Sequence, residues 1–278
     1  MHLDFYSWRC YNECAKHYKL EYMDKAPLPY PENKYFALYG NVMQKFFEMY
    51  SNNWGKTDPN MSPSVIEDKI KIIFDNFLKT EHIVWGARFA NQSGEDILQE
   101  AIASAKTILY SANKEYFLNT SSEVPIKLET KDNDTLSIKI DFVHTISSNI
   151  LNKRILVFDG KGTRKLGNVS NDQIYLYALL YFFSTQIMPS SLGFFYYRFN
   201  TFVPVDLSMD ILNAFRARLS LGLKTIRNDT EFKANPCTKS CKYCGYQTDC
   251  QEYIHRPKRK RKSHVPISET TGLAEFGF

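Results

Sequence analysis

The chain has 278 residues, of which 44% are hydrophobic and 15% aromatic, so it is long enough for one domain with a large buried core. No apolar run reaches the roughly 18 residues that a membrane-spanning helix needs, and the N-terminus lacks the apolar segment of a signal peptide. We therefore expect an intracellular protein without a membrane partner, located in the cytoplasm, or in the nucleus if the host is eukaryotic or viral. Six cysteines in a reducing compartment favour metal ligands or buried thiols over disulfides.

The net charge of +5 comes from a run of six cations near the C-terminus. They are Arg256, Lys258, Arg259, Lys260, Arg261 and Lys262. Like charges at this density do not pack, so we expect residues 255–278 to be a disordered basic tail that can contact phosphates. A solubilising tail and a nuclear-import signal are the alternatives.

Helical periodicity dominates the first part of the chain. Apolar residues at helical spacing predict helices over residues 7–22, 35–50 and 94–110. A proline-rich linker separates the first two, and Ser62 followed by Pro63 predicts the start of a further helix. This N-terminal region, about residues 1–120, is therefore expected to be helical.

The centre of the chain has the composition of a sheet. β-Branched and aromatic residues predict strands over residues 124–128, 136–144, 155–158 and, after an apolar helix capped by Asn171 or Asp172, 193–203. An amphipathic helix follows over residues 207–226. We expect an α/β domain over residues 1–254, with a β core at about 121–205 and a helix with a cysteine motif at about 206–254.

Two carboxylates and a lysine follow the predicted strands. Asp141 lies on one strand, and Asp159 and Lys161 end the next. If these strands are neighbours, the three side chains meet at one edge, where Mg²⁺ or Mn²⁺ could be held by the carboxylates and a substrate phosphate. The metal would activate a water, and Lys161 would orient it or stabilise the transition state. Gln173 and Tyr177 share one face of the following helix and could point back at this site.

Cysteines gather at the two ends of the chain. Cys14 lies near the N-terminus, whereas Cys241, Cys244 and Cys250 form a C-x2-C-x5-C triplet that lacks a fourth ligand. The split predicts a metal site that joins the two ends of one domain. Cys10 and Cys237 are close enough in sequence to replace a ligand, and a zinc site made of Cys237 with the triplet is the local alternative.

The ordered motifs resemble the RecB-like nucleases of the PD-(D/E)XK superfamily, especially the four-cysteine iron-sulfur group that includes the CRISPR-associated exonucleases. Cys14 precedes Tyr18 and Tyr22 as in that family, and the family's Gly-x3-His-x3-Glu motif matches Gly40 to Glu48, with Gln44 in place of histidine. Its Asp, Asp/Glu-x-Lys and Gln-x3-Tyr motifs then match the five residues of the predicted cation site, and the cysteine triplet follows. The resemblance covers residues from about 14 to 250.

The resemblance implies a restriction-endonuclease-like mixed sheet flanked by helices and a structural [4Fe-4S] cluster on Cys14, Cys241, Cys244 and Cys250. It implies a Mg²⁺ or Mn²⁺ site that includes Glu48 and Gln44 beside Asp141 and Asp159. The implied catalytic residues are Asp141, Asp159, Lys161, Glu48, Gln173 and Tyr177. Since an amide oxygen is a poorer Mn²⁺ ligand than an imidazole, Gln44 is expected to change the metal preference or the activity.

The expected reaction is metal-dependent hydrolysis of DNA, most plausibly by a single-strand or end-directed exonuclease in recombination, repair or replication. A helicase, integrase or recombination protein would be its partner. The candidate DNA-binding residues are Arg164, Lys165, Tyr177 and Arg198, which follow or face the catalytic strand ends. A non-catalytic DNA-binding or recombination scaffold with a degraded metal site, and a zinc-bearing structural adaptor, are the alternative interpretations.

Overall fold

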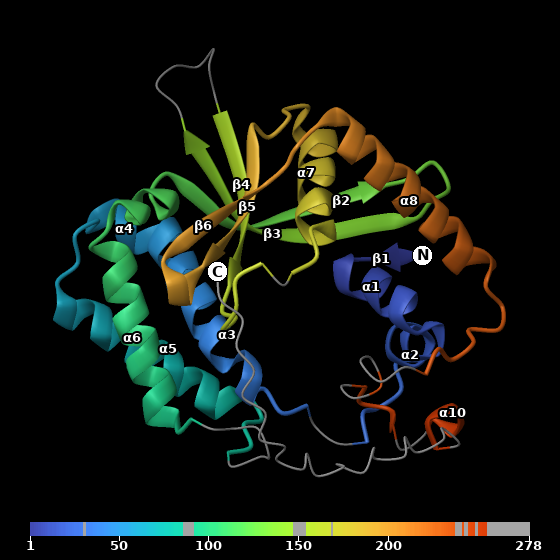
Figure 1. Cartoon of the computed structure of the whole chain (residues 1–278), viewed down its shortest axis with the longest axis horizontal. Helices are drawn as coiled ribbons and strands as arrows, with labels where there is room; N and C mark the ends of the chain where they lie inside the picture. The colour runs from blue at the N-terminus through green and yellow to red at the C-terminus, as the bar shows by residue number, and fades with distance from the viewer. Residues whose placement is uncertain are drawn as a thin grey trace, which may run out of the picture.

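A computed structural model describes residues 1–29, 32–85, 92–146, 154–167, 169–236, 241, 244–247 and 250–254. Its centre is a six-stranded sheet with helices on both faces (Figure 1). The sheet contains both parallel and antiparallel pairs, so the predicted α/β fold with a mixed sheet is confirmed. The basic tail and Cys237 lie outside the described residues.

The strands run in the order β1-β3-β4-β5-β6, and β2 pairs with the other edge of β3. They are β1 (His2–Leu3), β2 (Thr120–Glu129), β3 (Thr135–Ile146), β4 (Arg154–Lys161), β5 (Ser191–Tyr196) and β6 (Thr201–Val205). A turn at residues 131–134 makes β2 and β3 an antiparallel hairpin, and α7 connects the parallel strands β4 and β5. On the edge of β3 that does not pair with β2, β1 pairs with the start of β3 and β4 pairs with the end of β3.

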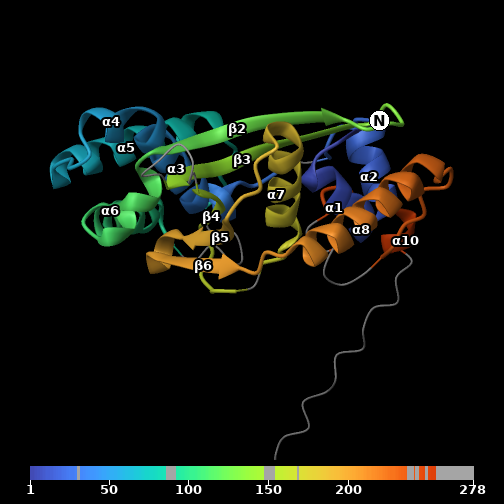
Figure 2. The same ribbon diagram turned by 90° about the horizontal axis from the view of Figure 1, so that it is seen from above.

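Helices cover the two faces of the sheet as separate layers, as Figure 2 shows from above. They are α1 (Phe5–Glu13), α2 (Ala15–Tyr18), α3 (Tyr35–Met49), α4 (Gly55–Thr57), α5 (Pro63–Thr80), α6 (Gly94–Leu109), α7 (Asp172–Thr185), α8 (Met209–Asn228) and α10 (Gln251–Ile254). Side chains of α1, α7 and α8 form one core with the sheet, and those of α3, α5 and α6 form the other.

Strand β4 is buried on both faces, which explains its continuous apolar run. Ile155 and Val157 point into the core that contains α7, whereas Leu156 and Phe158 point into the core that contains α3. Since side chains alternate along a strand, Asp159 and Lys161 continue the α7 side, and Gly160 continues the α3 side. This alternation places the Asp159 and Lys161 side chains on the face of the sheet that α7 covers.

Two predicted elements differ in the structure, and one strand was not predicted. The helix predicted over residues 7–22 is interrupted at Cys14, where the backbone is extended (φ −162°, ψ 109°). The last part of the predicted range is a π-helix, Lys19–Met23. The strand predicted over residues 193–203 is two antiparallel strands, separated by a 3₁₀ turn at Tyr197–Phe199 and by Asn200 at φ +44°. Strand β1 was not predicted, because two residues carry no periodicity.

The N- and C-terminal parts of the described chain lie side by side, with α10 beside α2 (Figure 1). Lys16 Nζ lies 2.7 Å from the Glu252 carboxylate, and the Tyr246 hydroxyl donates a hydrogen bond to the Ala26 carbonyl at 2.9 Å. Both contacts span more than 200 residues of sequence. Among the described residues, no helix combines the length and apolar character needed to cross a bilayer.

Candidate active site

Asp141 and Asp159 lie where β3 and β4 separate. The last bridged pair of these strands is Phe142 with Phe158, so the next position on each strand is one of the two aspartates. Opposite residues of an antiparallel pair point to the same face. The structure thus brings the two predicted carboxylates together, on the face covered by α7.

A chain of polar contacts joins these carboxylates to α7. Asp141 accepts hydrogen bonds from the Gly160 amide at 3.1 Å and from the Tyr177 hydroxyl at 3.2 Å. Tyr177 in turn accepts from the Gln173 amide at 2.9 Å, and the Gln173 oxygen accepts from Lys161 Nζ at 3.1 Å. Lys161 closes the circuit through an ion pair with Asp159. All five residues of the predicted strand-end site therefore lie in one network.

Burial and neighbouring charges shift the pKa values of three side chains in this network. Burial and the neighbouring Asp159 raise the pKa of Asp141 well above its usual range. Burial would lower the pKa of Lys161, but the Asp159 carboxylate outweighs it, so the pKa of Lys161 is raised and the side chain stays charged. Burial also raises the pKa of Tyr177 well above its ordinary value, so the hydroxyl remains a neutral donor.

The donor set fits a hard divalent cation. Asp159 is only 2% exposed, and its buried Oδ2 contacts the Lys161 ammonium as an ion pair. Two neighbouring carboxylates with one ammonium between them are costly to bury unless a further cation joins them. Mg²⁺ and Mn²⁺ prefer such oxygen ligands.

Gln44 and Glu48 of α3 approach from the other face of the sheet. The Gln44 oxygen accepts a hydrogen bond from the Tyr197 hydroxyl at 2.6 Å, and its amide nitrogen donates to Glu123 at 3.2 Å. Glu48 lies one turn later, and Lys45 Nζ is 2.8 and 2.9 Å from its two carboxylate oxygens. Their roles as metal ligands stay predictions.

Because Gly160 has no side chain, Tyr197 and Gln44 can approach β4 closely on the α3 side of the sheet. A Cβ added there would lie 1.9 Å from the Tyr197 hydroxyl and 2.6 Å from the Gln44 oxygen. Only glycine therefore fits the middle position of the Asp-Gly-Lys motif in this arrangement.

Two residues that sequence reasoning missed share a surface groove with Asp141 and Tyr177. One is Tyr6 of α1, which is 61% exposed. Glu123 of β2 is the other. Glu123 could have been identified from the sequence. The turn at residues 131–134 sets the register of the β2–β3 hairpin, and this register places Glu123 opposite Asp141.

The predicted DNA-binding residues are in different surroundings. Arg164 is exposed and bonds to Gln92, and Lys165 is exposed. Arg198 is largely buried, pairs with Glu100, donates to the Gly162 carbonyl at 2.9 Å and lies 3.7 Å from the Tyr39 ring centre. Tyr177 is 4% exposed and binds Asp141. Contacts of all four with DNA stay predictions.

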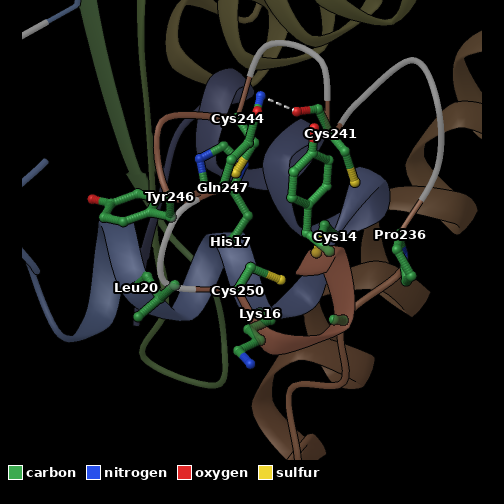
Figure 3. A pocket seen from close by; sticks show the side chains of 12 residues that line it. Cys14, Lys16, His17, Leu20, Pro236, Cys241, Cys244, Tyr246, Gln247 and Cys250 are labelled. Atoms are coloured by element: carbon green, nitrogen blue, oxygen red, sulfur yellow. Dashed lines mark hydrogen bonds between the residues drawn. The ribbon is translucent and has the colours of Figure 1, made fainter. Parts of the chain in front are cut away.

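The four predicted cluster ligands line a single pocket (Figure 3). Cys14 lies at the break between α1 and α2, and Cys241, Cys244 and Cys250 come from the C-terminal segment. Burial raises the pKa of the Cys244 thiol, and the other three cysteines raise it further. Cys14 Sγ accepts a hydrogen bond from the Asn235 amide at 3.4 Å. Soft thiolates gathered in this way fit an iron-sulfur cluster or zinc.

A second group of donors adjoins this pocket. Donor atoms of Cys10, His17 and Glu21 all lie within 4.8 Å of one another. Burial raises the pKa of Cys10 to about 12, and Glu21 adds to the shift. His17 Nε2 lies 2.8 Å from the Glu21 carboxylate. Cys10 therefore has partners of its own beside the four-cysteine pocket.

A comparison with protein-family models identifies a family for this chain. A model of the PD-(D/E)XK nuclease superfamily matches residues 5–251. The solved structures that match include "Crystal structure of SSO0001", with 13% identity, a TM-score of 0.31, and coverage of 76% of this chain and 95% of that one. The comparison with curated proteins gives no match. Since the family model spans most of the sequence and both strand-end carboxylates, the chain belongs to the PD-(D/E)XK nuclease superfamily.

Proposed function

We propose that this protein is a metal-dependent deoxyribonuclease that acts on single strands or at DNA ends, in recombination, repair or replication. Membership of the superfamily indicates a metal-dependent nuclease. The observation that carries the proposal is the circuit in which Asp141, Asp159 and Lys161 meet Gln173 and Tyr177 beside an open groove.

Asp141 and Asp159 would hold the divalent cation, which supplies an activated water and offsets charge on the scissile phosphate. Lys161 is held charged between Asp159 and Gln173, so its ammonium can orient a water or stabilise the negative charge that develops at phosphorus. Tyr177 and the Gly160 amide fix the orientation of the Asp141 carboxylate. Gln173 fixes Lys161 and Tyr177 together.

Action on unpaired strands is supported by the groove lining. The exposed ring of Tyr6 lies beside the buried Phe5 at the same groove as Asp141. Aromatic side chains bind unpaired bases by stacking, which contributes about 1–3 kcal/mol per base. A duplex keeps its bases stacked on one another and would leave Tyr6 unused.

The test compares degradation of linear single-stranded, circular single-stranded and duplex DNA in Mg²⁺ or Mn²⁺ by wild type and Asp159→Ala. We expect wild type to degrade linear single strands, and the variant to lose activity by about 100-fold or more, because losing a direct ligand exceeds the effect of losing its supporting contacts. Cleavage of circular strands would show an endonuclease. Equal inertness of both proteins under both metals would move the scaffold alternative ahead.

We also propose that Cys14, Cys241, Cys244 and Cys250 hold a [4Fe-4S] cluster with a structural role. The shared pocket and the soft donor set support this proposal. The zinc site that would use Cys237 remains the alternative, as does a single ion on Cys10, His17 and Glu21.

Iron, sulfide and zinc contents of anaerobically purified protein separate these possibilities. We expect about four irons and four sulfides per chain in wild type and in Cys10→Ala, and loss of both in Cys14→Ala. Cys10→Ala is the matched control, because it removes a neighbouring thiol from the same helical segment. Zinc without sulfide, unaffected by Cys14→Ala, would instead establish the adaptor-type site.

A further inference from the structure

Glu123 stands directly opposite Asp141 in the β2–β3 hairpin. The bridged pairs on either side are Ser122 with Phe142 and Val124 with Ile140, so Glu123 is in register with Asp141. Its backbone lies in the left-handed region at φ +54°, within a strand. The two carboxylates line the same groove.

We propose that Glu123 is a further ligand of the divalent-cation site, beside Asp141 and Asp159. This inference rests on the nuclease function proposed above. It assigns a further acidic ligand on β2, outside the motifs that identified the other site residues.

The position of Glu123 is fixed from behind by buried groups. Its Oε1 accepts a hydrogen bond from the Gln44 amide at 3.2 Å, and the Gln44 oxygen accepts from the Tyr197 hydroxyl at 2.6 Å. Tyr197 is 1% exposed. A carboxylate anchored through a buried chain of hydrogen bonds is held in place before a cation arrives, which favours binding.

The same contacts explain the glutamine at position 44. Its oxygen is already bound to Tyr197, and its amide nitrogen faces the carboxylate. An amide can do both at once, whereas a cation prefers the charged oxygens of Glu123 to an amide oxygen that is already engaged. Gln44 is thus a positioning residue for Glu123.

The other carboxylate oxygen of Glu123 contacts an exposed lysine, which a metal cation could replace. Glu123 Oε2 lies 2.5 Å from Lys139 Nζ, and the Lys139 side chain is 64% exposed. A solvent-exposed ion pair contributes little, so a divalent cation can replace the ammonium at this oxygen.

Asp159 lies on the other side of Asp141. It occupies the position opposite Asp141 on β4, and its buried Oδ2 has the Lys161 ammonium as its partner. Asp141 therefore has one carboxylate neighbour on β4 and one on β2. Three neighbouring carboxylates with two ammonium groups, Lys161 and Lys139, leave room for a cation.

Binding of Mn²⁺ to the full-length protein without DNA, measured by calorimetry and by the loss of the free-ion electron paramagnetic resonance signal, tests the proposal. The variants are Glu123→Gln, Asp159→Asn and, as the matched control, Glu129→Gln, which is exposed at the far end of the same strand. We expect Glu123→Gln to weaken Mn²⁺ binding by about 10-fold or more. Glu129→Gln should bind as wild type, and the fold of Glu123→Gln is checked by circular dichroism.

Wild-type affinity in Glu123→Gln, with loss of binding in Asp159→Asn, would overturn the role of Glu123 and leave the nuclease proposal intact. An equal loss in Glu123→Gln and Glu129→Gln would also overturn it, because the effect would then be one of net charge. Failure of wild type itself to bind Mn²⁺ would overturn the cation site as a whole.

Discussion

At the scale of single residues, the burial of Asp141 beside Asp159 opposes the stability of the metal-free fold. Burial and Asp159 raise the pKa of Asp141, which means that the ionised form is disfavoured in the folded state. A raised pKa of an acid contributes stability that is present below the unfolded pKa and lost as pH rises through the folded value. The ionised Asp141 side chain therefore destabilises the metal-free fold at neutral pH.

Asp141→Asn should stabilise the metal-free protein at neutral pH. An asparagine can still accept from the Gly160 amide and donate to the Tyr177 oxygen, while the charge is removed. Thermal unfolding in EDTA should show a higher Tm for the variant at pH 8, by a few degrees for each kcal/mol gained. The difference should shrink as pH falls towards the usual carboxyl range. A lower Tm than wild type at pH 8 would contradict this account.

Residue identities alone found the strand-end acids but not their neighbours. Asp141, Asp159 and Lys161 follow apolar strand patterns, and the structure brings them together. Glu123 is one acid on a half-exposed strand, and its role depends on a cross-strand register and a left-handed backbone. Tyr6 reaches the groove from the other end of the sequence, through tertiary packing of α1.

At the scale of elements, the site depends on how closely α3 approaches the end of β4. Gly40 of α3 faces Gly162, which follows the strand. A Cβ added at Gly162 would lie 2.5 Å from the Gly40 Cα, whereas one added at Gly40 would meet its nearest atom at 3.7 Å. A side chain at position 40 would therefore fit at this contact, whereas one at position 162 would collide with α3.

Gly162→Ala should push α3 away from the catalytic strand end and disturb the Gln44 and Arg198 contacts beside it. Steric crowding of this kind costs about 1–3 kcal/mol. Urea unfolding should show that loss, together with reduced cleavage. Gly40→Ala is the control, because it adds a methyl group at ordinary contact distance and raises helix propensity by up to about 1 kcal/mol. Equal losses in both variants would refute the asymmetry.

Periodicity predicted most elements but not their interruptions. Ser62 caps α5 and Ser93 caps α6, as polar residues before apolar helical runs do. The break at Cys14 and the turn at Tyr197–Phe199 lie inside continuous patterns. Tertiary contacts cause both: Cys14 turns its thiol into the cysteine pocket, and the Tyr197 hydroxyl binds Gln44. Such long-range contacts override local preference.

At the scale of the whole molecule, helix α1 connects the cysteine pocket to the catalytic groove. Tyr6 in its first turn lines the groove, and Cys14 follows its last turn. Between them, Trp8 packs on Phe215 of α8, with ring centres 5.7 Å apart. The Tyr11 hydroxyl donates to Asp229 at 2.7 Å. Fixing Cys14 to the C-terminal cysteines would therefore hold α1 beside the groove.

Loss of the proposed cluster should loosen α1 and leave the helices on the opposite face of the sheet unchanged. In Cys14→Ala, amide hydrogen exchange should increase over residues 5–13, because the C-terminal end of the helix would lose its attachment to the other three cysteines. Exchange over α5, residues 63–80, is the internal control, since this helix packs into the other core. Unchanged exchange in α1 after complete loss of iron would show that packing on α8 alone positions Tyr6. Increased exchange in both helices would indicate that the cluster stabilises the whole domain, and local coupling between the two sites would then be rejected.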